Sequence, residues 1–423
     1  MRRLNSLHRR LRVVAVGAMA AAAWLIPPAH AAEPITIGFG MALTGGLAPN
    51  GKAALLAMQI WAEDANAKGG LLGRPVKLIY YDDQSNPAQV PGIYTKLLDV
   101  DKVDLVVGGY GTNMVTPAMP VIIAHERAFL GLLALAVNSQ FHYPRYFSIA
   151  PMGGPEPKQS FAAPFFAVVA GQQPKLQTLA IVGADAEFPK NAIEGALALA
   201  KQNGFKVVYN QSYPPSTADF TPIVRAIQAT NPDMVFVASY PPDTVGMIRA
   251  ASEVGLKTKL FGGGMVGLQS TSIKTQLGPL LNGIVDYDFL LPGSGLDTPE
   301  AMAFLNQFQA KASGSGVDPL GYYLPPFAYA DMQVLADAVE GTHSLDQAKL
   351  ADYLRSHSFN TVAGPISFGP EGEWTEARVL EVQFQGVQGH DMEQFKNPKT
   401  EVILAPEKYK NGTLRFPYTE AKQ

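Results

Sequence analysis

The amino-acid sequence predicts an α/β fold of two doubly wound lobes, each built on a parallel sheet. Short, nearly continuous apolar runs alternate with longer helical segments, which is typical of parallel strands buried on both faces. This alternation restarts after YFSIAP, residues 146–151. The length of 423 residues also exceeds one ordinary core and suits two lobes.

In the first lobe, the helical run at about 51–67 stops at Gly69-Gly70, and a strand ending in two carboxylates follows a short turn. Short turns and right-handed crossovers between such elements give a doubly wound sheet. The expected strands are ITIGFG (35–40), VKLIYYDD (76–83), DLVVGG (104–109) and AFLGLLAL (128–135), and further helices are expected at about 88–101 and 114–125.

The second lobe repeats the plan, and a different tail follows it. A 27-residue spacing separates Lys77 from Asp104 and Lys206 from Asp233, although βαβ units of about 30 residues are common enough to share a spacing. The tail predicts three helices and then a hairpin of GPISF (364–368) and VLEVQFQGVQ (379–388). The second-lobe strands are expected at 178–185, 206–213, 233–239 and 259–264, with helices at about 190–203, 219–230 and 242–254, and the tail helices at about 299–312, 326–341 and 346–357.

The N-terminus predicts export. MRRLNSLHRRLR is basic, VVAVGAMAAAAWLI is apolar but short for a membrane span, and Ala29-His30-Ala31 fits a cleavage site. Residues 1–31 are therefore expected to be a signal peptide, and the mature chain to begin near Ala32 in the periplasm.

Charge and cysteine content exclude several classes of protein. The signal segment holds five arginines and no acidic residue, so the rest of the chain carries 28 basic against 36 acidic residues, a net charge of −8. Nucleic acid is not an expected partner, because it rewards a basic surface. The absence of cysteine excludes disulfides, thiolate chemistry and cysteine-ligated zinc.

Two motifs suggest chemistry but have plainer interpretations. The Asp82-Asp83 carboxylates would not converge, because adjacent strand residues point to opposite faces, so a turn-capping role is favoured. GGGMVG (262–267) matches a dinucleotide fingerprint but sits on a late strand, so NAD binding is not expected. Its glycines would instead allow a close approach of the backbone.

VVGGYGTNM (106–114) is the candidate anion cradle, because it ends a strand and enters a helix capped by Thr112 or Asn113. Plain helix capping is the alternative. Aromatic residues at expected loop ends either face an interlobe crevice or pack in the core. They are Tyr110, Phe188, Tyr240, Tyr322, Tyr323 and Phe327.

No catalytic or metal-binding set emerges from the sequence. The seven histidines show no metal-ligand spacing, and no G-x-S-x-G elbow occurs. We therefore expect neither an enzyme, nor a metal, nor a cofactor.

Four stretches resemble the branched-chain-amino-acid type of periplasmic solute-binding proteins, in register from about 35 to 385. They are ALTGGLAPNG, DANAKGGLLGRPVKLIYYDDQSNPAQ, DLVVGG and EVGLKTKLFGG. The resemblance implies the type I periplasmic binding fold, in which two lobes joined by three hinge crossovers close on a ligand. It also implies a monomer that serves the permease of an ABC importer. Crossings are then expected at about 146–151, 284–289 and 361–366, giving one lobe of 33–148 plus 287–362 and another of 149–286 plus 363–423.

The resemblance also suggests ligand contacts. The loop that holds an amino acid's carboxylate in that family falls on residues 111–114, where Thr112 and Asn113 keep polar groups. The next contact loop falls on residues 133–136, with Ala136 where relatives have threonine, and Phe188 and Tyr240 come from the second lobe. The expected ligand-binding residues are Asn50, Tyr110, Gly111, Thr112, Asn113, Leu133, Ala134, Ala136, Phe188, Tyr240, Gly264 and Met265.

One departure from that family bears on the ligand. Amino-acid-binding relatives place an acidic residue after the strand at about 260 to pair with the ammonium, and here the position is Gly264. The relatives' local disulfide falls on Ser85 and Gly111, so both halves are absent. We therefore expect an uncharged or monoanionic small molecule, such as an aromatic or aliphatic carboxylate, rather than an amino acid. A branched-chain amino acid receptor, a sensor without transport, and a periplasmic enzyme on a similar scaffold are the alternatives.

Overall fold

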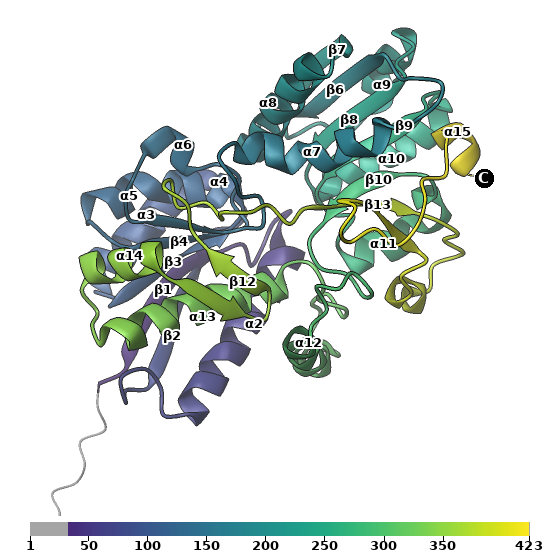
Figure 1. Ribbon diagram of the computed structural model, residues 1–423. Coiled ribbons are helices and arrows are strands. Elements are labelled where there is room, and N and C mark those ends of the chain that lie inside the picture. Colours follow the sequence, from purple (N-terminus) through teal and green to yellow (C-terminus); the bar gives the residue numbers. More distant parts are fainter. Residues whose placement is uncertain (1–32, 423) are drawn as a thin grey trace, which may run out of the picture.

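The computed structural model describes residues 33–422, so the expected signal segment 1–31 lies outside the described part. The chain forms two lobes side by side, each with its own sheet (Figure 1). Helices α13 and α14, coloured green, lie with the purple and blue N-terminal lobe, so that lobe is assembled from distant parts of the chain.

The first sheet has the order β2-β1-β3-β4-β5, and every pair is parallel. Strands β3, β4 and β5 are buried along their whole length, which explains their unbroken apolar runs. The strands are β1 (Ile35–Met41), β2 (Val76–Asp82), β3 (Leu105–Tyr110), β4 (Phe129–Leu132) and β5 (Tyr146–Ile149).

The second sheet has the order β14-β13-β10-β9-β8-β6-β7. The strands from β7 to β10 in this order are parallel, and β13 and β14 extend the sheet in antiparallel pairing. Its members are β6 (Thr178–Ala184), β7 (Lys206–Tyr213), β8 (Met234–Ser239), β9 (Leu260–Met265), β10 (Val285–Asp288), β13 (Leu380–Phe384) and β14 (Glu401–Ala405).

Helices pack against both sheets. The first lobe has α2 (Ala48–Ala67), α3 (Val90–Thr95), α4 (Thr112–Val115), α5 (Met119–Ala124), α6 (Asn138–Phe141), α12 (Pro299–Ala312), α13 (Pro325–Thr342) and α14 (Gln347–Ser356). The second has α7 (Pro157–Val169), α8 (Glu187–Gln202), α9 (Thr221–Ala229), α10 (Pro241–Val254), α11 (Thr271–Leu277) and α15 (Tyr418–Ala421).

Local structure supports the interpretation of the opening βαβ unit. Gly69 and Gly70 have φ of 104° and 78°, and the Gly70 N–H donates to Ala65 O at 2.9 Å, so they cap α2. Asp82 Oδ1 accepts the N–H of Leu43 at 3.0 Å. Its neighbour Asp83 likewise holds the following turn. The paired carboxylates are therefore structural.

The GGGMVG motif is also structural. Gly262 has φ of 153°, and a Cβ there would lie 1.6 Å from the carbonyl oxygen of Val285 on β10. Glycine is needed because the neighbouring strand passes so close. This accounts for the motif without a nucleotide.

Three segments carry the chain between the lobes. The pairing of β5 with β4 keeps the first lobe to Ile149, and β10 stays in the second sheet to Asp288. The first and third segments run together, since Gly154 N–H donates to Trp374 O and Arg378 N–H donates to Pro151 O. Strand pairing thus puts the lobe boundaries after residue 149, after residue 288 and within residues 375–379. The boundaries expected from the sequence were 148/149, 286/287 and 362/363.

The expected tail hairpin is wrong. β12 (Gly364–Ser367) pairs with β11 (Ser358–Thr361) beside α13, while β13 joins the second sheet. Both runs have strand periodicity, but the segment between them crosses from one lobe to the other.

Candidate functional site

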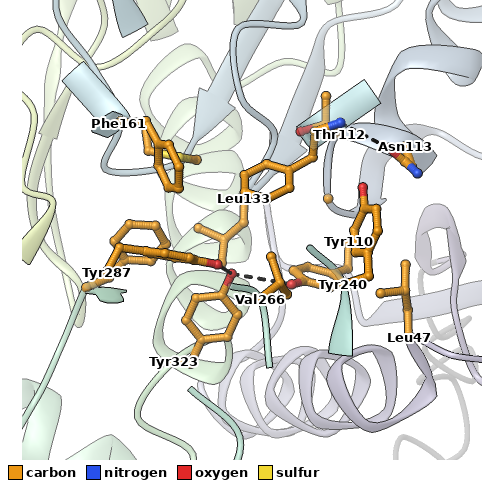
Figure 2. A pocket seen from close by; sticks show the side chains of 14 residues that line it. Leu47, Tyr110, Thr112, Asn113, Leu133, Phe161, Tyr240, Val266, Tyr287 and Tyr323 are labelled. Atoms are coloured by element: carbon orange, nitrogen blue, oxygen red, sulfur yellow. Dashed lines mark hydrogen bonds between the residues drawn. The ribbon is translucent and has the colours of Figure 1, made fainter. Parts of the chain in front are cut away.

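A cavity lies between the lobes at the carboxyl ends of strands from both sheets, where ligands bind in open α/β folds. Its empty space, including the mouth, is about 370 Å³. Only about 20 Å³ of this space is open to the centre of a water-sized sphere, which is room for about one water molecule. The lobes therefore lie closed over the site, and admitting a ligand requires the lining side chains to move apart. The cavity is lined by Leu47, Tyr110, Gly111, Thr112, Asn113, Leu133, Met152, Phe161, Phe188, Tyr240, Val266, Tyr287, Phe289 and Tyr323 (Figure 2).

One edge of the cavity is rich in hydrogen-bond donors. β3 ends at Tyr110, and Gly111, with φ of 87°, turns the chain into α4. Thr112 Oγ1 accepts the Leu135 N–H at 2.9 Å, so its own hydroxyl proton can donate. Asn113 Oδ1 accepts the Phe188 N–H at 3.2 Å, so its Nδ2 group can face a ligand. Since the first N–H groups of a helix lack intrahelical acceptors, this edge suits a carboxylate.

The remaining walls are mainly aromatic. The Phe161 ring lies edge-on to Tyr287 and Phe188, with centroids 4.9 and 5.4 Å away. Among residues 33–422, no Asp, Glu, Lys, Arg or His side chain lines this cavity. The cavity therefore presents hydroxyl groups, amide groups and aromatic ring surfaces to a ligand, and none of these groups carries a formal charge.

Gly264 lies behind the aromatic wall. A Cβ at this position would be 3.1 Å from Cε1 of Phe161, so that ring occupies the space a side chain at 264 would enter. The nearby carboxyl of Asp286 accepts hydrogen bonds from Met265 N–H at 2.9 Å and from Gln269 Nε2 at 3.0 Å. Burial raises the pKa of Asp286 well above its usual value. Asp286 thus holds the turn after β9 and is not offered to the cavity.

The two lobes touch across the cleft. Asn191 Nδ2 on α8 donates to Leu135 O at 2.9 Å, and the Tyr287 and Tyr323 hydroxyls are 3.1 Å apart. Thr271 donates to Asp318 through both its N–H and its hydroxyl. These contacts describe a closed arrangement in which both lobes face the same small space.

Most of the expected contact residues lie at this cavity, and some do not. Asn50 lies beneath it and donates to the Tyr110 hydroxyl at 3.4 Å. Ala134, Gly264 and Met265 are buried beside the cavity without lining it. Ala136, with φ of 54°, turns away and lines a second cleft near the crossings, so its expected place in the cavity is corrected. Those that line the cavity are Tyr110, Gly111, Thr112, Asn113, Leu133, Phe188 and Tyr240.

Sequence reasoning missed part of the lining. Tyr287 and Phe289 sit at the second crossing, where DYDFL alternates acidic and aromatic residues. A strand period of two puts both rings on one face, and this signal could have identified them. No comparable signal marks four other lining residues, Leu47, Met152, Phe161 and Val266. The sequence indicates Tyr323 only as one of several aromatic residues at expected loop ends.

Residues 33–422 contain neither a candidate metal site nor a candidate membrane span. No three His, Asp or Glu side chains come close enough together to hold a metal ion. No helix there is both long and apolar enough to cross a membrane.

Comparison with known proteins places this geometry in a family. Residues 34–386 match a family model described as periplasmic binding protein. An amino acid binding protein of Pseudomonas aeruginosa is 26% identical over 81% of this chain and 88% of its own length. A leucine binding protein from Thermotoga maritima has a TM-score of 0.70 at 19% identity, over 83% of this chain and 96% of that one. A solute binding protein from R. palustris, solved in complex with benzoate, has a TM-score of 0.70 at 17% identity, over 88% and 97%.

Proposed function

Because this chain belongs to the periplasmic binding protein family, we propose that it is the solute-binding receptor of an ABC importer. The proposed ligand is a small carboxylate without an ammonium group and with an apolar, preferably aromatic, body. The receptor would act in the periplasm as a monomer after removal of residues 1–31, and would deliver its ligand to the importer's permease.

The observation that carries the proposal is the uncharged, aromatic lining of the cavity. An amino acid brings an ammonium group that costs several kcal/mol to bury without a counter-charge. No acidic side chain among the described residues lines the cavity, and the Phe161 ring fills the space beside Gly264. A carboxylate, in contrast, can be held by hydroxyl, amide and backbone N–H donors, as at Thr112 and Asn113.

The mechanism follows from the shared cavity. Leu133 and Thr112 come from the first lobe, and Phe188 and Tyr240 from the second. A ligand that contacts both lobes favours the closed form over the open one. The importer would then recognise the closed arrangement of the two lobe surfaces.

The decisive test is a thermal-shift and calorimetric screen of the mature protein. Benzoate, phenylacetate and short aliphatic carboxylates are compared with leucine, valine and phenylalanine. We expect the unfolding temperature to rise only with carboxylates that lack an ammonium group, because a ligand of the native state stabilises it. Binding of leucine or valine with a micromolar Kd would overturn the proposal and favour the amino acid receptor suggested by the Pseudomonas aeruginosa relative.

Gly264 provides a second prediction. Gly264→Asp should weaken benzoate binding roughly tenfold more than Gly264→Asn does, because it adds a negative charge to the wall of a site that holds an anion. Both variants bring a side chain of nearly equal size against Phe161, so their ratio isolates the charge. Equal Kd values for the two variants in calorimetry would show that position 264 does not sense the ligand's charge.

A further inference from the structure

Three tyrosine hydroxyls meet at the cavity wall. The hydroxyl of Tyr323 lies 3.3 Å from that of Tyr110 and 3.1 Å from that of Tyr287. Asn50 Nδ2 donates to the Tyr110 hydroxyl at 3.4 Å. Tyr110 and Tyr323 lie in the first lobe, and Tyr287 lies on β10 of the second, so this hydroxyl chain crosses the cleft.

The chain holds one proton more than its links use. The Asn50 amide donates to the Tyr110 oxygen, so this bond uses none of the phenol protons. Three phenol protons then serve the two links between hydroxyls, in which either oxygen can donate, and one proton is left over among the three. Among residues 33–422, Tyr323 is the only hydrogen-bond partner of the Tyr287 hydroxyl. Burial raises the pKa of all three phenols, so each carries its proton at neutral pH.

The Tyr287 hydroxyl can therefore make a second hydrogen bond, and it lies away from the carboxylate edge. Figure 2 shows the hydroxyls of Tyr287 and Tyr323 meeting near the centre of the view, apart from Thr112 and Asn113. Phe161 and Phe289 flank the Tyr287 ring, with centroids 4.9 and 5.2 Å away, so its hydroxyl is a polar point in an apolar wall. A buried hydroxyl group that makes fewer hydrogen bonds than it can costs free energy, which a suitable ligand group would remove.

We propose that Tyr287 is a specificity-determining residue that selects ring carboxylates bearing a hydrogen-bond acceptor, such as a hydroxyl group, remote from the carboxylate. This inference rests on the proposed function and narrows its substrate class. A ligand with only a methyl group at that point would leave the second hydrogen bond of the Tyr287 hydroxyl unmade.

The test compares ligands of nearly equal size. The affinities of 3- and 4-hydroxybenzoate are measured by calorimetry at pH 7.5 against those of the matching methylbenzoates and of benzoate. One hydrogen bond predicts that a hydroxybenzoate binds roughly tenfold more tightly than its methyl counterpart. Tyr287→Phe should abolish this ratio. Tyr80→Phe, at an exposed tyrosine of β2, is the matched control and should retain the ratio.

The outcomes separate the two proposals. If benzoate binds and the hydroxyl and methyl ligands bind equally well, the role of Tyr287 is overturned and the carboxylate receptor stands. If the ratio is present but survives in Tyr287→Phe, another residue selects the hydroxyl group. If none of these ring carboxylates binds, the role of Tyr287 is overturned, and the proposed function then depends on the aliphatic carboxylates of the first screen. The ratio of hydroxybenzoate to methylbenzoate affinity is measured on the wild-type protein. Equal affinities there would overturn the role of Tyr287 even if Tyr287→Phe does not fold.

Discussion

Replacing Lys274 by methionine should lower the free energy of unfolding by roughly 3–5 kcal/mol at pH 7.5. Lys274 Nζ lies 2.5 Å from Glu401 Oε1, and the side chains are only 2% and 3% exposed. Asp288, at the end of β10, is buried in the same group of charges. Without the lysine, two buried carboxyl groups lose their cation. Removing one partner of such a pair is costly because the other charge stays buried.

The pKa values in this cluster give the prediction a pH signature. Burial alone would lower the pKa of Lys274, but the charges of Glu401 and Asp288 outweigh it and raise that pKa. Burial also raises the pKa of Asp288 to about 7 despite the lysine. In Lys274→Met both carboxyl groups would keep their protons to higher pH, so the loss of stability should be smaller at pH 5 than at pH 8.

A matched surface pair controls for the loss of a lysine. Lys311 pairs with Glu63, but these side chains are 38% and 63% exposed, so Lys311→Met should cost less than about 1 kcal/mol. Urea unfolding of both variants gives the comparison. Equal costs would mean that water reaches the Lys274 site and that the pair is not a buried one.

Much of the fold could be predicted because it depends on local pattern. Buried parallel strands such as β3 and β8 have no polar face and show as apolar runs, and the glycines after α2 mark its end. The prediction of a tail hairpin is wrong because strand periodicity indicates that a segment is a strand but not which strand it pairs with. β12 and β13 are neighbours in sequence but belong to different lobes.

The site was less predictable, for a related reason. Thr112 and Asn113 follow a strand directly, so their place at a strand end can be derived. Phe161 lies on the buried face of α7, where an aromatic residue predicts core packing equally well. Only the approach of α7 to Gly264 turns its ring toward the cleft. The expectation that Ala136 lines the cavity is wrong because its positive φ redirects the chain after β4. An alanine gives no sequence signal of such a turn.

Glu373→Gln should stabilise the protein more as the pH rises. Glu373 lies just before the third crossing, is 5% exposed, and neither of its carboxylate oxygens has a hydrogen-bond partner within residues 33–422. Burial raises its pKa from 4.5 to about 8, partly offset by the neighbouring Ser148 hydroxyl and assisted slightly by the charge of Glu371. Among residues 33–422, no cationic side chain offsets this rise in the pKa of Glu373. The side chains that face it from β5 are those of Tyr146 and Ser148.

The sign follows from proton counting. Below pH 4.5 the carboxyl is protonated in both the folded and the unfolded chain, so it contributes no pH dependence. Between pH 4.5 and about 8 the folded chain keeps a proton that the unfolded chain releases, so wild-type stability falls by up to about 1.4 kcal/mol per pH unit from this group. Glutamine has no such proton, so its advantage over wild type should grow through this window and level off above pH 8.

Urea unfolding of wild type and Glu373→Gln at pH 5.0, 6.5 and 8.5 measures this difference. Glu376→Gln, an exposed carboxylate three residues away, is the matched control and should show no growing advantage. The other buried carboxyls, including Asp331 on α13, titrate in both proteins and cancel in the comparison. A constant difference across the three pH values would mean that Glu373 is ionised in the folded protein. A partner would then have to reach it through the second cleft, which Glu373 and Ala136 both line.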